Sequence, residues 1–142
     1  MGAATGLRLQ RARRRHLRLG RRGERVAARL VREIGMEILA RNYATAHGEI
    51  DIVARHADVL CFVEVKTRRR EILYAPALAV GFHKKRRIVR TARDYIRDIH
   101  APNVPRRFDV VELVLHDMRV HTARYWPAAF TEQEVSTRKG AW

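Results

Sequence analysis

The chain has 142 residues, a length that suits one domain of ordinary size. Its 30 Lys and Arg residues against 15 Asp and Glu residues give a formal net charge of +15, so we expect a polyanionic partner such as nucleic acid or an anionic membrane surface. The single cysteine excludes an intramolecular disulfide, and the lack of a signal sequence or of a run of about 18 apolar residues predicts a cytoplasmic protein without a membrane span.

The N-terminal segment, residues 1–22, holds eight arginines and no acid, and its apolar residues follow no sustained period. Such basic blocks are typical of disordered segments that bind anions, so the folded domain is expected to begin near Gly23. A helix is predicted next, over residues 24–34, with Gly35 as its C-terminal cap. Its apolar face would consist of Ala27, Leu30, Val31 and Ile34.

The remaining elements are predicted from runs of apolar residues and from their spacing. Three strands are expected first, then a long helix with one apolar and one basic side, then two further strands, at residues 36–43, 49–55, 60–66, 76–99, 107–115 and 118–125. This order predicts an α/β fold with a mixed β-sheet core flanked by helices. We therefore divide the chain into a basic disordered tail, a folded α/β domain and a frayed C-terminal tail, at residues 1–22, 23–130 and 131–142.

Two of these strands are predicted to form a β-hairpin that gathers charged residues on one face. If they pair through a two-residue turn at Ala57-Asp58, opposed residues have numbers that sum to 115. Asp51 then faces Glu64, Glu49 faces Lys66, and all four side chains emerge on one side. The other side is wholly apolar and is expected to be core, with Ile50, Ile52, Ala54, Cys61, Val63 and Val65.

The opposed carboxylates of Asp51 and Glu64 indicate a metal site. Like charges placed directly opposite each other destabilise a sheet, and such local conflict is typical of functional sites. A divalent cation would reverse the sign of the interaction, and carboxylate oxygens suit Mg²⁺ or Mn²⁺. Lys66 could then position a water or stabilise charge on a phosphate, as metal-assisted phosphodiester hydrolysis requires. The alternative is a solvated strand with surface ion pairs worth about 0–1 kcal/mol, and the spacing alone does not separate the two interpretations.

The same residues carry a resemblance to a known family. Gly48-Glu49-Ile50-Asp51 and Phe62-Val63-Glu64-Val65-Lys66-Thr67-Arg68 resemble the signature of the YraN-like family of small bacterial proteins, and the likeness extends over roughly residues 23–130. The resemblance implies a restriction-endonuclease-like fold of the PD-(D/E)XK superfamily, similar to archaeal Holliday-junction resolvases. It further implies Asp51 and Glu64 as metal ligands, Lys66 as the catalytic lysine, Glu24 as a further catalytic acid and Glu49 as a supporting residue.

Basic residues around this hairpin form a candidate surface for phosphates. A cluster follows the Glu64 strand and continues on the long helix: Arg68, Arg69, Arg70, Lys84, Lys85, Arg86 and Arg87. Contacts of this kind supply affinity and salt dependence without reading sequence. Each of these residues taken singly is better explained as part of a solvated face, whereas the cluster beside an acidic metal site favours phosphate binding.

Three functions remain open on the sequence. The leading hypothesis is an endonuclease that cleaves structured or branched DNA with Mg²⁺ or Mn²⁺. A homodimer is expected in that case, because resolvases of this fold act as symmetric dimers. The second is a module with a nuclease-like fold that binds nucleic acid without cleaving it. The third is a ribosome- or membrane-associated basic adaptor tethered by residues 1–22.

Overall fold

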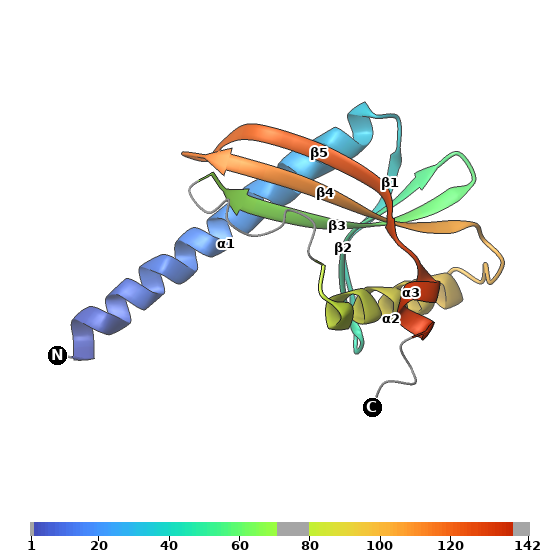
Figure 1. Ribbon diagram of the computed structural model, residues 1–142, viewed down its shortest axis with the longest axis horizontal. Coiled ribbons are helices and arrows are strands. Elements are labelled where there is room, and N and C mark those ends of the chain that lie inside the picture. Colours follow the sequence, from blue (N-terminus) through green and yellow to red (C-terminus); the bar gives the residue numbers. More distant parts are fainter. Residues whose placement is uncertain (1, 71–79, 138–142) are drawn as a thin grey trace.

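A five-stranded mixed β-sheet with helices on both faces forms the body of the molecule (Figure 1). The computed structural model describes residues 2–70 and 80–137. The strands lie in the order β1-β2-β3-β4-β5, in which only β3 and β4 run parallel, because α2 connects them. The elements are α1 (Gly2–Glu33), β1 (Glu37–Thr45), β2 (Gly48–His56), β3 (Val59–Arg69), α2 (Phe82–Asp98), β4 (Arg106–His116), β5 (Arg119–Phe130) and α3 (Glu132–Ser136).

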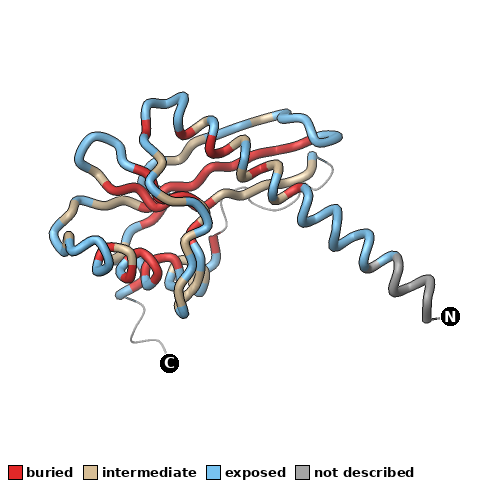
Figure 2. The backbone as a smooth tube through the Cα atoms, turned by 180° about the vertical axis from the view of Figure 1, so that it is seen from behind, coloured by how far each residue is buried: buried red, intermediate tan, exposed pale blue. Residues whose placement is uncertain are grey.

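The sheet separates two apolar layers, which Figure 2 shows as buried stretches of the central strands and of the helix faces against them. On one side, Val53 and Phe62 pack with Ile88 of α2. On the other, Ile52 and Val63 pack with residues of α1. The hairpin is therefore covered on both faces, whereas one apolar and one charged face were predicted. Ile50 also lies in the α2 layer and not in the α1 layer with Ile52, so the predicted alternation is wrong at this point of β2.

The α/β prediction is confirmed, and every predicted strand is present with ends shifted by a few residues. The predicted hairpin turn at Ala57-Asp58 is also confirmed: Ala57 has a positive φ of 53°, and the strands pair from His56 with Val59 to Ile52 with Val63. Gly35 caps α1 as expected, with a φ of 91° that favours glycine, and Met36 N donates to Val31 O at 3.1 Å.

The N-terminal segment differs from the expected disordered tail, because α1 is continuous from Gly2 to Glu33. Arginine, alanine and leucine are strong helix formers, and this preference outweighs the repulsion between the arginines. Packing against the sheet begins at Leu19, which is buried, whereas residues 10–18 are exposed and project from the body (Figures 1 and 2). We refer to residues 8–20 as the arm of α1. Glu24 consequently lies well inside a helix and not in a first turn.

Two helices differ from their predicted bounds. The predicted helix over 76–99 begins at Phe82 among the described residues, and residues 76–79 of that prediction lie outside them. The C-terminal segment was expected to fray from residue 131, but Glu132–Ser136 form α3, capped by Thr131 Oγ1, which accepts from Glu134 N. Among the helices that the structure describes, none combines the length and the hydropathy that crossing a membrane requires.

Candidate active site

The candidate site lies where β2 and β3 separate. Beyond the pair of Ile52 and Val63 the two strands no longer form a ladder, so the predicted pairs of Asp51 with Glu64 and of Glu49 with Lys66 are absent from the described register. Instead Val65 N donates to Asp51 Oδ2 at 2.8 Å, while β3 continues alongside β4. The fork opens the sheet at the two carboxylates that the sequence had singled out.

Glu64 is the buried acid of this site. Glu64 is only 8% exposed. Its Oε1 lies 3.3 Å from Lys84 Nζ at the start of α2, and its Oε2 is buried without a hydrogen-bond partner among the described residues. Burial, followed by the nearby Asp51 carboxylate, raises the pKa of Glu64 to about 7. The side chain therefore carries an oxygen that water does not reach and that no described donor satisfies.

Three acids converge on one small pocket. Glu24 from α1, Asp51 from β2 and Glu64 from β3 line a cavity of about 210 Å³. Burial raises the pKa of Glu24, and the Asp51 and Glu49 carboxylates raise it further, so these groups are close enough to repel. Glu49 itself is exposed, and it lies at the margin of the acidic group.

Lys66 lies two residues beyond Glu64 on β3, so the two side chains are on the same face of the strand. Burial and the neighbouring charge of Arg68 lower the pKa of Lys66, and the Glu64 carboxylate opposes that shift. Directly across the parallel ladder lies Glu112 of β4, which is 7% exposed and has a buried Oε2 without a hydrogen-bond partner among the described residues. Sequence reasoning missed Glu112. The signal for it was a single acid inside the apolar run Val110-Val111-Glu112-Leu113-Val114.

Glu24 reaches the pocket because α1 approaches β3 at a glycine. A Cβ atom on Gly23 would lie 1.8 Å from Thr67 Oγ1 and 2.9 Å from Thr67 Cβ, so only glycine fits against this strand. Gly20, one turn earlier on α1, has open space around it.

We expect the two glycines of α1 to respond to alanine with opposite signs. Gly23→Ala should lower the free energy of unfolding by about 1–3 kcal/mol, because the new methyl group forces α1 away from Thr67. Gly20→Ala should raise it by roughly 0.5–1 kcal/mol, because alanine favours the helix and meets no neighbour. Urea denaturation followed by circular dichroism measures both, and stabilisation by Gly23→Ala would contradict the close approach of α1 to β3.

The residues of the pocket fit a divalent cation held partly by the protein. The described residues contain no group of three or more His, Cys, Asp and Glu side chains arranged to bind a metal ion. Two carboxylates do converge, and the unsatisfied Glu64 Oε2 offers a hard oxygen without a competing donor. Mg²⁺ is commonly bound in this way, through one or two carboxylates with waters and substrate phosphate completing its shell.

The basic residues predicted to bind phosphate lie in different environments. Arg68 and Arg69 line a cavity between the arm of α1 and the end of β3, whereas Arg70, Arg86 and Arg87 are exposed. Lys84 pairs with Glu64 and so belongs to the acidic site. Lys85 turns the other way: it pairs with Glu134 of α3 at 3.2 Å and lies over the Phe130 ring.

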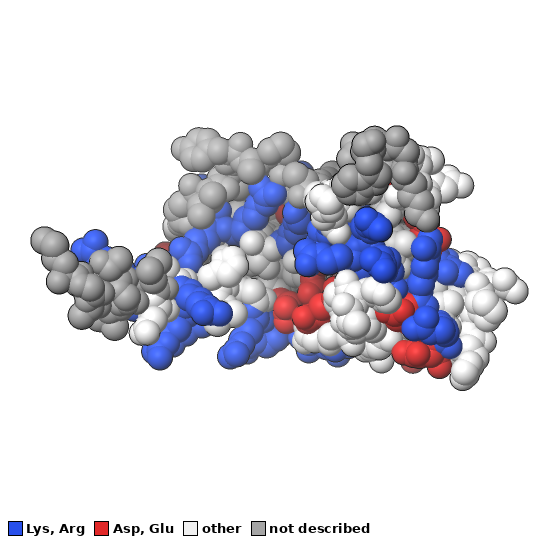
Figure 3. Space-filling model, turned by 90° about the horizontal axis from the view of Figure 1, so that it is seen from below, with Lys and Arg blue, Asp and Glu red and all other residues white. Residues whose placement is uncertain are grey.

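The charges around the pocket have a clear distribution. Figure 3 shows a face on which a small acidic patch is surrounded by lysine and arginine side chains. His47, which precedes the Glu49 motif, is engaged elsewhere: its Nδ1 lies 2.7 Å from Asp94 Oδ2 on α2. The arrangement therefore combines a local group of carboxylates with a surrounding positive field that attracts anions.

Comparisons with known proteins agree with this core. The family model of the uncharacterised protein family UPF0102 matches residues 23–113. A UPF0102 protein of Nocardia farcinica is 46% identical over 97 residues, which cover 68% of this chain and 76% of the relative. A UPF0102 protein of Syntrophotalea carbinolica is 50% identical over 95 residues, covering 67% of this chain and 77% of the relative. A third, of Desulfosudis oleivorans, is 42% identical over 105 residues, or 74% of this chain and 85% of the relative.

Proposed function

The chain belongs to the uncharacterised protein family UPF0102, and we propose that it is a metal-dependent endonuclease that cleaves phosphodiester bonds in structured or branched DNA. The observation that carries the proposal is the buried carboxylate Glu64, whose Oε2 has no partner among the described residues and which lies beside Asp51 and Lys66. This resembles the acidic pair and lysine of the PD-(D/E)XK superfamily.

The energetics favour a functional reason for this arrangement. A buried carboxylate oxygen without a donor, such as Glu64 Oε2, costs about 1–3 kcal/mol, and the repulsion between the Asp51 and Glu64 carboxylates adds to that cost. A purely structural position would be served better by glutamine or by an apolar residue. A cation between Asp51 and Glu64 would remove both penalties, and this is why we propose Mg²⁺ or Mn²⁺ as the cofactor.

The proposed division of labour follows from the positions of the side chains. Asp51 and Glu64 would hold the metal ion, which supplies Lewis-acid activation of the phosphate and an acidified water. Lys66 would stabilise negative charge that develops on the phosphate or orient the attacking water, and its lowered pKa suits a partly dehydrated position. Glu24 would help to orient the water from the opposite wall of the pocket. Lys84 would hold Glu64 in place through its ion pair at 3.3 Å.

The test is cleavage of labelled single-stranded, duplex, flap and four-way-junction DNA with Mg²⁺, Mn²⁺, Ca²⁺ or EDTA. We expect Lys66→Met to slow metal-dependent cleavage by about 10²–10³, the usual cost of losing one group that stabilises the transition-state charge. DNA binding in Ca²⁺ should change little in this variant, because one cation among many contributes little to affinity.

Arg55→Met is the matched control, because it also removes one cation. The Arg55 side chain is exposed near the end of β2, away from the acidic pocket, and pairs with Glu37 of β1. The cleavage rate of Arg55→Met should stay close to that of the wild type. Salt-sensitive binding without cleavage in either metal would refute the nuclease. That result would favour the non-cleaving module, which the net charge of +15 also supports.

A further inference from the structure

The arm of α1 and the end of β3 enclose a groove that leads away from the acidic site. The acidic pocket shares His16, Leu19 and Thr67 with a second cavity of about 450 Å³. The second cavity in turn shares Arg15, Leu19 and Arg69 with a third, of about 490 Å³, which reaches the turn between β4 and β5. The three cavities are therefore neighbours along α1.

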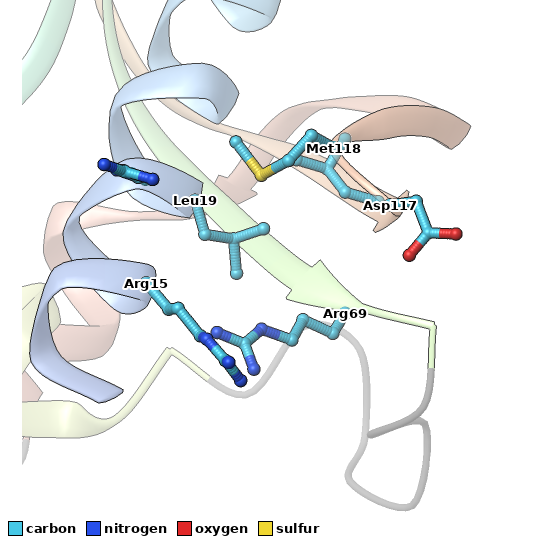
Figure 4. A pocket seen from close by; sticks show the side chains of 7 residues that line it. Arg15, Leu19, Arg69, Asp117 and Met118 are labelled. Atoms are coloured by element: carbon cyan, nitrogen blue, oxygen red, sulfur yellow. The ribbon is translucent and has the colours of Figure 1, made fainter. Parts of the chain in front are cut away.

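Basic side chains and an apolar floor face each other in the third cavity. Leu19, Leu115 and Met118 supply apolar surface, and Arg15, Arg18 and Arg69 supply guanidinium groups. In Figure 4, the guanidinium groups of Arg15 and Arg69 point toward one another below Leu19. We call this the arginine groove and define it by these six residues.

The convergence of Arg15 and Arg69 has no internal explanation in the described part of the chain. Neither guanidinium takes part in any of the ion pairs between described residues. Among the described residues that line this cavity the acid is Asp117, which lies 3.5 Å from His116, and its carboxylate points away from Arg15 in Figure 4. Two like charges that approach each other without a counter-charge repel, and an anion between them would turn this repulsion into attraction.

The arm is held in position on the body. Arg22 Nε donates to Met118 O at 3.3 Å, which ties α1 to the turn between β4 and β5 just beyond the groove. Gly23 packs directly on Thr67 one residue later. The wall that carries Arg15 and Arg18 is therefore anchored next to the acidic pocket, although residues 1–22 lie outside the range that the family model matches.

We propose that the arginine groove binds an unpaired strand of nucleic acid, with phosphates between Arg15 and Arg69 and a base or sugar against Leu19, Leu115 and Met118. Guanidinium groups pair with phosphates and also stack on unstacked bases, so a groove with both surfaces suits a single strand. A duplex keeps its bases inside and would leave the apolar floor unused. The inference rests on the proposed nuclease function and specifies its substrate as DNA with an unpaired segment beside the cleavage site.

The experiment measures binding of the full chain to two fluorescent DNA hairpins in Ca²⁺, one blunt and one with a short single-stranded extension. Arg15→Gln/Arg69→Gln should weaken binding of the extended hairpin on the order of tenfold at physiological salt. The slope of log affinity against log salt should fall by about 1.4 for two lost single-strand phosphate contacts. The blunt hairpin should be affected much less.

Two further variants separate specific contacts from general charge. Arg13→Gln/Arg14→Gln removes the same charge from exposed positions of α1 that line none of the three cavities, and it should change both affinities by less than the groove variant. Met118→Ala should weaken binding of the extended hairpin without changing the salt slope, because it removes apolar surface alone.

Each outcome decides the inference. Equal losses in the groove and control variants, or equal losses on the two hairpins, would overturn it. If Arg15→Gln/Arg69→Gln cleaves DNA with the same rate and KM as the wild type, the proposed strand binding in the arginine groove is overturned. The nuclease proposal would remain standing in that case. A wild-type protein that neither binds nor cleaves DNA would overturn both.

Discussion

Glu64→Gln is expected to abolish metal-dependent cleavage and, in EDTA at pH 8, to make the protein more stable than the wild type. Loss of a metal-binding carboxylate removes several kcal/mol of transition-state stabilisation, which corresponds to a rate reduction on the order of 10³–10⁴ or more. Glutamine keeps the shape of the side chain while removing a buried negative charge beside Asp51. The gain in stability should be on the order of 1–3 kcal/mol.

The direction with pH follows from the raised pKa of Glu64. The folded wild type holds a proton on Glu64 up to about pH 7, whereas the unfolded chain releases it near the ordinary pKa of 4.5. The folded state therefore binds more protons between these values, and stability falls as pH rises through this window. Glu64→Gln and the wild type should have similar stability near pH 4.5 and diverge above it, as thermal unfolding in EDTA would measure.

Glu37→Gln is the matched control, because it makes the same chemical change on an exposed strand position whose side chain is 58% exposed. It should change the stability difference between pH 5 and pH 8 very little. Mg²⁺ should stabilise the wild type most at high pH and should stabilise Glu64→Gln much less. A Glu64→Gln variant that is less stable than the wild type at pH 8 in EDTA would contradict the proposed cost of burying the Glu64 charge beside Asp51.

Asp109→Ala is expected to lower the free energy of unfolding by about 3–5 kcal/mol. The Asp109 side chain does not line the acidic pocket, so the effect is on stability. Asp109 is completely buried and satisfied: Arg107 Nε donates to Oδ2 at 3.0 Å, Ala128 N donates to Oδ1 at 2.8 Å, and the Tyr125 hydroxyl donates to Oδ2. The carboxylate thus joins β4 to the irregular part of β5, where the register shifts between Phe108 and Val110. Its removal would leave Arg107 without its ion pair and the backbone N–H of Ala128 without an acceptor.

Urea denaturation of Asp109→Ala, Asp109→Asn and Tyr125→Phe would measure this network. Tyr125→Phe should cost about 1–2 kcal/mol, the usual contribution of a hydrogen bond to a charged acceptor, and Asp109→Asn should fall between the two. In the folded state, burial first and the Asp109 carboxylate second raise the pKa of Tyr125, which keeps the hydroxyl protonated as a donor. A loss below about 1 kcal/mol in Asp109→Ala would contradict this account.

Local sequence rules predicted one part of the β2–β3 hairpin and not the other. Alternation and turn chemistry predicted the turn at Ala57-Asp58 and the register from Ile52 to His56, because neighbouring strands joined by a tight turn have few other options. The same rules failed at Asp51 and at Glu49 before it, for which the described register shows no partner on β3. β3 pairs with the sequence-distant strand β4 from Leu60 with Arg106 to Arg69 with Leu115, so beyond Val63 it keeps this partner while its pairing with β2 has ended. The acids were therefore found, but in a fork and not in a ladder.

Other misses have the same origin in tertiary contacts. Lys84 and Lys85 look equivalent in the sequence, yet the rotation of α2 places one against Glu64 and the other against Glu134. Glu112 looks like a chance acid in an apolar strand until the parallel ladder sets it across from Lys66. The arm of α1 has a local cause instead: it is helical and not disordered, because the helix propensity of its residues outweighs the repulsion between its arginines.

The continuity of α1 sets a fixed spacing in the molecule. Nine residues of one helix separate Arg15 in the groove from Glu24 in the acidic pocket, which corresponds to roughly 13 Å along the axis. A rigid helix between a strand-binding position and a cleavage position acts as a ruler. Under the proposed function, products would therefore end at a constant number of nucleotides from the boundary between paired and unpaired DNA, whatever the sequence at that boundary.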